Sequence, residues 1–399
     1  MTRAEKVIAR CRQLAAFSEQ PGRTTRTFLS APMHDVHRLV GHWMREAGMD
    51  VTIDAAGNIR GLHGPPDRPR LLIASHLDTV IDAGAFDGIL GVLLGIAMAE
   101  AKPGLSVEVI GFSEEESIRF GFPFIGSRAV VGTLDDVALA RCDSAGITVT
   151  QAIRDYGLDP ACVPAARLSP HVFAYLEFHI EQGPVLDQRN LPLAVVSEIT
   201  GITRLLVTFE GAANHAGTTP MTTRRDALTC AAEWALDLER MASRQEHLVA
   251  TVGSFQVSPG AVNIIPGRVD ATLDLRHPND QQRHQAVETA LKYLEILGER
   301  RHIAIRHEVM MDQPSVAMDP GLRARLVTAT GGAPEIPSGA FHDAMVLAPL
   351  VPACMLFLRT PGGLSHHPRE TVLEADVELA IEAGIRFIAE LRPEGQHSL

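Results

Sequence analysis

The chain has 399 residues, and 46% of them are hydrophobic, 21% charged and 5% aromatic, which is the composition of a globular protein with a core. This composition excludes a disordered linker or a fibrous protein, and the length predicts at least two domains. The formal net charge of -12 leaves no basic field for a phosphate backbone or an anionic lipid surface, so we expect no nucleic acid partner and no membrane partner.

The cysteines and the N-terminal residues indicate a compartment. The five cysteines are odd in number, scattered and never in C-x-x-C spacing, which is typical of free thiols in a reducing environment. The first residues mix charge into an amphipathic helix and lack the apolar run of a signal peptide, and no apolar stretch reaches about 18 residues. We therefore expect a cytoplasmic protein.

The first elements in chain order predict a mostly parallel sheet. Residues 34–47 place apolar side chains at helical spacing and end at Gly48. Residues 71–75 and 105–112 are short apolar runs of buried strands, and residues 88–100 between them have the pattern of a helix. This strand, helix, strand order is a βαβ unit, in which ligands collect at the carboxyl ends of the strands.

The pattern changes after about residue 201. Strands are predicted at 204–209, 247–257, 268–276 and 302–309, and helices at 225–241 and 281–299. This βαββαβ order is ferredoxin-like. After residue 314 an apolar strand at 354–358 and a last helix at 373–391 return to the first pattern. We therefore predict an α/β protein whose catalytic domain has a mixed, mostly parallel sheet (residues 1–200 and 314–399), with an inserted ferredoxin-like domain (residues 201–313).

Polar segments follow the predicted strands and connections. They are H-L-D at 76–78, F-D-G at 86–88, E-E-E at 114–116, H-I-E-Q-G at 179–183 and S-H-H-P at 365–368. Taken singly, each has an ordinary structural interpretation, such as Asp87 as a turn or helix cap. Together they favour a divalent metal, because imidazole and carboxylate suit such ions and three adjacent carboxylates are costly to desolvate without a cation.

These residues lie in motifs that identify a family. The chain resembles the M20 metallopeptidase clan, and within it the hydantoinase/carbamoylase branch. The matching segments include SHLDTV, GAFDGILGVL, EEESIRF, FHIEQGPVL, GAANHAGTTPM, RRDA, VNIIPG, DLRH, PSGAFHDA and LSHHPRE. They run over nearly the whole chain, and HIEQG followed by HAGTTPM is specific to this branch.

The resemblance implies a dinuclear centre with two divalent metal ions per subunit. The ligands would be His76, Asp87, Glu116, His179 and His366. Asp87 would bridge the two ions. His76 and Glu116, or a neighbouring ligand, would complete one ion. His179 and His366 would complete the other, and the sequence leaves this pairing open.

The resemblance also places residues around these ligands. Asp78 looks like the carboxylate that orients the ring of His76, a role that ligating histidines generally require. His366, and not the adjacent His367, matches the ligand position. Ser117 stands where the family pattern has glycine, which loosens the register of the glutamates. The metal itself is left open among zinc, manganese, cobalt and nickel.

Two residues match catalytic positions. Glu115 would be the general base that takes a proton from the attacking water and returns it to the leaving nitrogen. His215 in N-H-A-G would stabilise the negative charge that develops on the attacked group. His215 lies in the predicted insertion. In the family this histidine reaches the active site of the partner subunit, so the resemblance implies a homodimer whose inserted domains act as lids over the substrate.

Further residues match substrate-binding positions. They are Gln182, Asn263, Arg276 and Gly339. The guanidinium group of Arg276 can bind a carboxylate at two points, although without the resemblance Arg276 would be interpreted as a surface ion-pair partner. Asn263 would add an amide donor, and Gln182 would contact a ureido group. Phe341 stands where the family pattern S-G-A-G-H-D-A has its second glycine, which alters the pocket close to the substrate.

The resemblance therefore implies a metal-dependent amidohydrolase. Its substrate would be a small ureido carboxylate, either an N-carbamoyl-L-amino acid or allantoate. An M20-type dipeptidase or aminoacylase is the alternative within the clan, and Gln182 and Asn263 favour the ureido branch. A binding protein that has lost hydrolysis is the alternative from another class, and it is disfavoured because every ligand and base position is filled.

Overall fold

The computed structural model describes residues 1–391 and divides the chain into two compact units. One unit is Met1–Ser197 together with the chain from Ala317 on, and the other is Glu198–Val316. The predicted insertion, residues 201–313, lies inside the second unit. Among the described residues, no helix is both long enough and apolar enough to cross a membrane.

The first unit is built on a mixed sheet, as predicted. Its strands are β1 (Asp50–Ile53), β2 (Ile59–His63), β3 (Arg70–His76), β4 (Ser106–Phe112), β5 (Val172–Ile180), β6 (Leu193–Ile199), β11 (Val316–Ala317), β12 (Glu335–Ser338) and β13 (Ala353–Leu358). The strand order is β1-β2-β4-β3-β5-β13-β6-β11, and β12 also pairs with β6. The central strands β4, β3, β5 and β13 are parallel, whereas β1, β2 and β6 pair antiparallel with their neighbours. Every residue of β3, β4 and β13 is buried, which explains their mostly apolar sequences.

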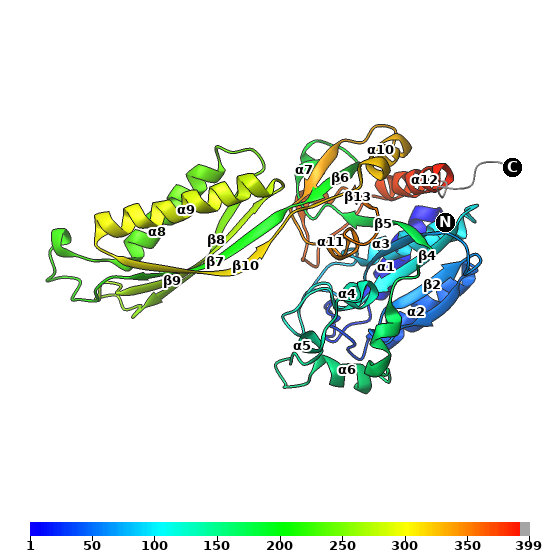
Figure 1. Cartoon of the computed structure of the whole chain (residues 1–399), viewed down its shortest axis with the longest axis horizontal. Coiled ribbons are helices and arrows are strands. Elements are labelled where there is room, and N and C mark those ends of the chain that lie inside the picture. The colour runs from blue at the N-terminus through cyan, green and yellow to red at the C-terminus, as the bar shows by residue number, and fades with distance from the viewer. Residues whose placement is uncertain (392–399) are drawn as a thin grey trace. The chain divides into compact units, whose positions relative to one another are not determined.

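The first unit also contains helices, several of which pack against this sheet. They are α1 (Arg3–Ala15), α2 (Met33–Glu46), α3 (Ile89–Glu100), α4 (Ile125–Val131), α5 (Asp136–Leu139), α6 (Val149–Asp155), η1 (Pro160–Ala166), α7 (Val185–Gln188), α10 (Pro320–Ala329), α11 (Ala344–Leu347), η3 (Pro361–Gly363) and α12 (Glu374–Glu390). Helix α3 is apolar on all sides because it is covered by β3, β4 and β5 on one side and by α1 and α12 on the other (Figure 1).

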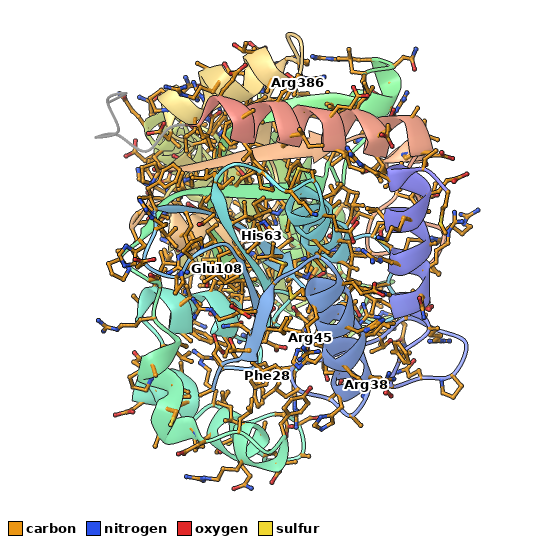
Figure 2. All side chains as sticks on the ribbon, turned by 90° about the vertical axis from the view of Figure 1, so that its right-hand side faces the viewer. Phe28, Arg38, Arg45, His63, Glu108 and Arg386 are labelled. Carbon is orange, nitrogen blue, oxygen red and sulfur yellow. The ribbon has the colours of Figure 1, made fainter. Side chains whose placement is uncertain are left out.

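A buried glutamate in the sheet of the first unit is paired with arginines on both sides. Glu108 on β4, labelled in Figure 2, is buried, and its Oε1 accepts hydrogen bonds from Nε and Nη2 of Arg60 on the neighbouring strand β2 at 3.0 and 2.6 Å. Arg70 of β3 lies on its other side, 3.5 Å from Oε2. The charge of this carboxylate is thus compensated at the edge of the core.

The second unit is a four-stranded antiparallel sheet with two long helices. Its elements are β7 (Gly201–Glu210), η2 (Met221–Thr223), α8 (Ala227–Ala242), β8 (Val249–Ser258), β9 (Arg268–His277), α9 (Asp280–Arg301) and β10 (Ala304–Gln313). The strand order β10-β7-β9-β8 with this βαββαβ sequence is ferredoxin-like. Strand β9 alternates between buried apolar residues, which pack with α8 and α9, and polar residues on the opposite face. A lid or dimerisation role for this unit stays a prediction.

Candidate metal centre

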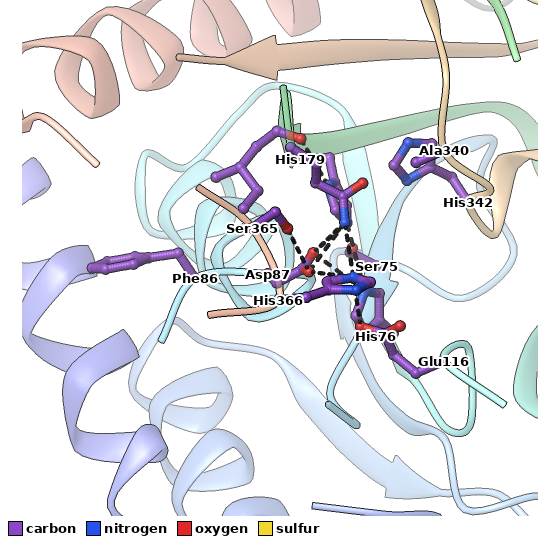
Figure 3. Close-up of polar contacts among 12 residues, drawn as sticks. Ser75, His76, Phe86, Asp87, Glu116, His179, Ala340, His342, Ser365 and His366 are labelled. Atoms are coloured by element: carbon purple, nitrogen blue, oxygen red, sulfur yellow. Dashed lines mark hydrogen bonds and ion pairs between the residues drawn. The ribbon is translucent and has the colours of Figure 1, made fainter. Parts of the chain in front are cut away.

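The structure brings together the side chains that were expected to bind metal, and we call His76, Asp87, Glu116, His179 and His366 the ligand cluster (Figure 3). His76 is the last residue of β3 and lies opposite Phe112, the last residue of β4. Glu116 follows β4, and His179 is near the end of β5. Because these strands are parallel, their carboxyl ends meet at one edge of the sheet.

The two oxygens of Asp87 face two different groups. Its Oδ1 lies 3.3 Å from Nε2 of His179 and 3.9 Å from Nε2 of His76. Its Oδ2 lies 3.2 Å from Nε2 of His366, and that nitrogen is 3.5 Å from Oε1 of Glu116. A carboxylate that offers one oxygen to each group has the geometry of a bridging ligand.

These distances bear on the pairing that the sequence left open. The resemblance suggested His76 with Glu116 or a neighbouring ligand, and His179 with His366. In the structure His76 lies beside His179, with Nε2 atoms 3.5 Å apart, and Glu116 lies beside His366. Ligand atoms of Glu116, His76 and Glu115 also lie close enough together to bind one ion, so Glu116 is near both groups. The reason is topological, because His76 and His179 end neighbouring parallel strands whereas His366 comes from the loop after η3.

Backbone carbonyls orient the two buried histidines. Nδ1 of His76 lies 3.0 Å from the carbonyl oxygen of Asp78, and Nδ1 of His179 lies 2.9 Å from that of Ile180. Each ring can therefore donate from Nδ1 and leave Nε2 to a metal. Burial lowers the pKa of His179 to about 4, so this ring is neutral, which is the form that binds metal.

The carboxylate of Asp78 contacts the backbone of the glutamates as well as facing the ring of His76. Its Oδ1 is 3.6 Å from Nδ1 of His76, farther than the residue's own carbonyl. Its two oxygens also accept hydrogen bonds from the N–H groups of Glu115 and Glu116, both at 3.0 Å. Asp78 therefore fixes the backbone of the two glutamates relative to β3, and its carbonyl oxygen is the nearer partner of the imidazole. An orienting role of its carboxylate stays a prediction.

Asp87 is held from several directions. Oε1 of Glu370 accepts hydrogen bonds from the N–H groups of Phe86 and Asp87, both at 3.0 Å. Ser365 Oγ donates to Oδ2 of Asp87 at 3.2 Å. Burial alone would raise the pKa of Asp87, but the hydrogen bond from His366 and the charges of the histidines hold it below its ordinary value. The bridging carboxylate is thus ionised and fixed.

Glycine at position 88 lets helix α3 begin against this cluster. Gly88 has φ +69°, and a Cβ atom there would lie 2.4 Å from Cε1 of His76. A larger residue would therefore displace either the ring of His76 or the backbone after Asp87.

The three adjacent glutamates divide into two roles. The carboxylate of Glu114 accepts hydrogen bonds from the N–H groups of Arg119 at 2.9 Å and Phe28 at 3.1 Å, so it closes a loop. Burial, and then the charges of neighbouring carboxylates, raise the pKa of Glu115 and Glu116 well above the ordinary value. Oε1 of Glu116 is buried and accepts no hydrogen bond from any described residue. This donor set fits divalent cations, which would neutralise the carboxylates and use the orphaned oxygen.

Two residues expected to bind substrate lie in the first unit. Nε2 of Gln182 donates to both oxygens of Asp87, at 3.2 and 3.0 Å, and lies 3.4 Å from Nε2 of His366. Its amide therefore already lies within the ligand cluster. Gly339 is exposed, and a Cβ atom there would meet no heavy atom within 4 Å.

The other expected residues lie in the second unit. The loops that carry His215 and Asn263 are bonded to each other, because Ala216 N–H donates to the carbonyl of Asn263 at 2.9 Å. Nδ1 of His215 accepts hydrogen bonds from the N–H groups of two following residues, at 3.0 and 3.2 Å, which directs Nε2 away from its own loop. Nε and Nη2 of Arg276 donate to the carboxylate of Asp274 at 2.8 and 3.1 Å. Arg276 therefore forms the ion pair that is expected without the resemblance. Its carboxylate-binding role stays a prediction.

Sequence reasoning missed Glu370 and Ser365 as supports of Asp87. Glu370 follows His366 by four residues in the S-H-H-P-R-E segment, and this proximity is the signal that was available. The same loop separates the two adjacent histidines. Nε2 of His366 faces Asp87, whereas Nδ1 of His367 accepts a hydrogen bond from the N–H of Arg369 at 3.1 Å.

Known proteins are similar to this chain over nearly its whole length. Residues 72–390 match the model of peptidase family M20/M25/M40. An N-carbamoyl-L-amino acid amidohydrolase from Geobacillus stearothermophilus is 38% identical over 396 residues, covering 96% of this chain and 97% of the relative. Allantoate deiminase 1 from Glycine max is 35% identical over 431 residues, covering 97% and 89%. The crystal structure of an amidase of the hydantoinase/carbamoylase family from Burkholderia multivorans has a TM-score of 0.90 at 29% identity and covers 97% of both chains.

Proposed function

The chain belongs to peptidase family M20/M25/M40, in its hydantoinase/carbamoylase branch, and we propose from this that it is a metal-dependent amidohydrolase of small ureido carboxylates. Its substrate is an N-carbamoyl-L-amino acid or allantoate, the compounds in the names of its relatives. The observation that carries the proposal is the arrangement of imidazole and carboxylate atoms on the two sides of Asp87. The relatives at 35% identity and above are named for ureido substrates, which disfavours a dipeptidase or aminoacylase.

Two divalent cations would share Asp87. His76 and His179 would complete one site, and Glu116 and His366 would complete the other. When bound, such cations act as Lewis acids and lower the pKa of a water molecule toward 7. Zinc, manganese, cobalt and nickel all suit these ligands.

Glu115 is proposed as the general base. It lies beside Glu116 and His76, and its backbone is fixed by Asp78. Its carboxylate would take the proton of the attacking water and deliver it to the nitrogen that leaves from the ureido carbon. Water and the carbamoyl group are thereby converted to carbon dioxide and ammonia, with the amine of the amino acid set free.

The second unit would supply the remaining contacts. His215 would donate a hydrogen bond to the oxygen of the attacked carbonyl, and Arg276 with Asn263 would bind the substrate carboxylate. Gln182 and Gly339 would contact the substrate from the first unit. We further propose a homodimer in which His215 acts on the substrate of the partner subunit.

The proposal is tested by ammonia release from a panel of compounds. Chelated protein is reloaded with each metal in turn and given allantoate, N-carbamoyl-L-amino acids, β-ureidopropionate and dipeptides. We expect turnover of ureido compounds only. Hydrolysis of the dipeptides without the ureido compounds would contradict the proposal. In the same assay Glu115→Gln should be inactive, whereas Glu46→Gln, at an exposed position on α2, should behave like the wild type.

A further inference from the structure

The loop between β12 and α11 carries Phe341, this chain's departure from the family pattern. The loop is folded back on itself, because Ser338 Oγ lies 2.9 Å from Nε2 of His342 and accepts a hydrogen bond from the N–H of Ala340 at 3.2 Å. His342 is buried, and its ring centroid is 4.4 Å from that of His179. Figure 3 shows Ala340 and His342 on one side of the ligand cluster. Phe341, between them in the chain, is therefore held next to the cluster.

Phe124 faces Phe341 from the segment that follows the glutamates. The two ring centroids are 6.4 Å apart and the planes are tilted by 50°. Phe124 is 5% exposed, and its N–H donates to the carbonyl of Glu114 at 2.7 Å. Its φ of 69° is uncommon for an aromatic residue, so the surrounding structure must hold the ring in place. The pair connects the segment that carries Glu115 to the loop that carries His342.

The loop leaves Phe341 partly accessible, next to an exposed glycine. Gly339 is exposed, and a Cβ atom there would meet no heavy atom within 4 Å. Phe341 itself is half-buried. The face of a phenyl ring offers no hydrogen-bond donor or acceptor of ordinary strength. A polar substrate arm against it would lose contacts with water and gain none, whereas an apolar side chain would gain from leaving water.

We propose that Phe341, backed by the buried ring of Phe124, receives the side chain of the substrate, and we call the two rings the aromatic wall. The enzyme then selects N-carbamoyl-L-amino acids with an apolar or aromatic side chain over allantoate, whose second ureido group is polar, and over N-carbamoylglycine, which has no side chain. This inference rests on the proposed function. The expected preference is about tenfold or more in kcat/KM, the discrimination that a hydrophobic pocket gives for small differences in apolar size.

The test uses the metal-loaded full chain and four compounds. They are N-carbamoyl-L-leucine, N-carbamoyl-L-phenylalanine, N-carbamoylglycine and allantoate. The kcat/KM of each is measured by ammonia release for the wild type, Phe341→Gly, which restores the family residue, and Phe341→Leu, which keeps an apolar surface. Phe122→Leu is the matched control, because Phe122 lies in the same segment as Phe124 but its ring packs against two arginines. The guanidinium carbons of Arg128 and Arg141 lie 4.9 and 4.8 Å from its ring centroid.

We expect the wild type to prefer the leucine and phenylalanine compounds. Phe341→Gly should reduce this preference by about tenfold, and Phe341→Leu and Phe122→Leu should keep most of it. A wild type that prefers allantoate, or a Phe341→Gly variant that changes all four compounds by the same factor, would overturn the aromatic wall.

Calorimetric binding of the same compounds separates failure of this inference from failure of the proposed function. It is measured on Glu115→Gln and on Glu115→Gln combined with Phe341→Gly. If no compound is hydrolysed by the wild type, the proposed function fails, yet a binding preference that disappears with Phe341→Gly would still support the aromatic wall. Equal binding of all four compounds, or no binding, would overturn it.

Discussion

Replacing Glu370 by alanine should weaken metal binding by about 10- to 100-fold, the usual effect of removing a group that supports a metal ligand. Glu370 does not belong to the ligand cluster, but its Oε1 accepts hydrogen bonds from the N–H groups of Phe86 and Asp87, both at 3.0 Å. A hydrogen bond to a charged group contributes about 1.5–3 kcal/mol, and alanine would leave both buried N–H groups unpaired. The bridging carboxylate of Asp87 would then lose its fixed position.

Glu370→Ala should lower the free energy of unfolding less in the metal-free protein than in the metal-loaded protein. Burial, and then the charge of Asp87, raise the pKa of Glu370 to about 8, so the ionised form of Glu370 is disfavoured when no cation is bound. Part of the contribution of Glu370 to stability is therefore offset until metal arrives. Thermal unfolding with and without metal measures this difference directly.

Glu370→Gln is the informative partner variant. Glutamine keeps an oxygen that can accept both hydrogen bonds, and its amide would take the place of Oε2, which accepts no hydrogen bond from any described residue. Metal affinity is measured by competition with a chromophoric chelator, with Glu382→Ala on the exposed face of α12 as control. We expect affinity close to that of the wild type for Gln and much weaker affinity for Ala. Unchanged metal affinity in Glu370→Ala, or an equal loss in both variants, would refute the idea that Glu370 positions Asp87 through the backbone N–H groups.

Further predictions concern the base, the substrate and pH. Glu115→Gln should lower kcat by about 100-fold or more while elemental analysis finds its metal unchanged, and retained turnover would remove the assigned base. Arg276→Ala should raise KM by about 10- to 100-fold in steady-state kinetics, and an unchanged KM would place carboxylate recognition elsewhere. Burial, and then the charge of His34, lower the pKa of His37 to about 4. The folded state therefore binds fewer protons than the unfolded state between pH 4 and about 6.5, so this group makes the protein less stable as pH falls through that window, by about 3 kcal/mol at most. Urea unfolding of His37→Gln should show a weaker dependence over the same window, and an unchanged dependence would contradict the assignment.

The sequence predicts the parallel core because the environment of its strands is uniform. Strands β3 and β4 are buried on both faces, so both are mostly apolar, with Glu108 as the charged residue within β4, and α3 between them is apolar on all sides. Strand β5 was not predicted as an element. Its buried residues include Glu177, which accepts hydrogen bonds from Tyr175 Oη at 2.8 Å and from the N–H of Ala344 at 3.0 Å.

The resemblance named the residues of the ligand cluster but could not give their arrangement. Which oxygen of Asp87 faces which histidine depends on β3 and β5 being neighbours in the sheet, and this pairing joins residues far apart in the chain. The contacts of Asp78 could not be predicted for a related reason. A sequence shows a carboxylate two residues after His76, but not that the carbonyl of the same residue lies closer to the ring.

The measurement that tests the account most directly is a metal titration of chelated protein, followed by both activity and bound metal. The account predicts that activity on a ureido carboxylate rises to a plateau at two ions per subunit, and that Asp87→Ala abolishes binding of both ions. Full activity of metal-free protein, saturation at one ion, or an Asp87→Ala variant that still binds two ions would contradict the shared carboxylate on which the proposed chemistry depends.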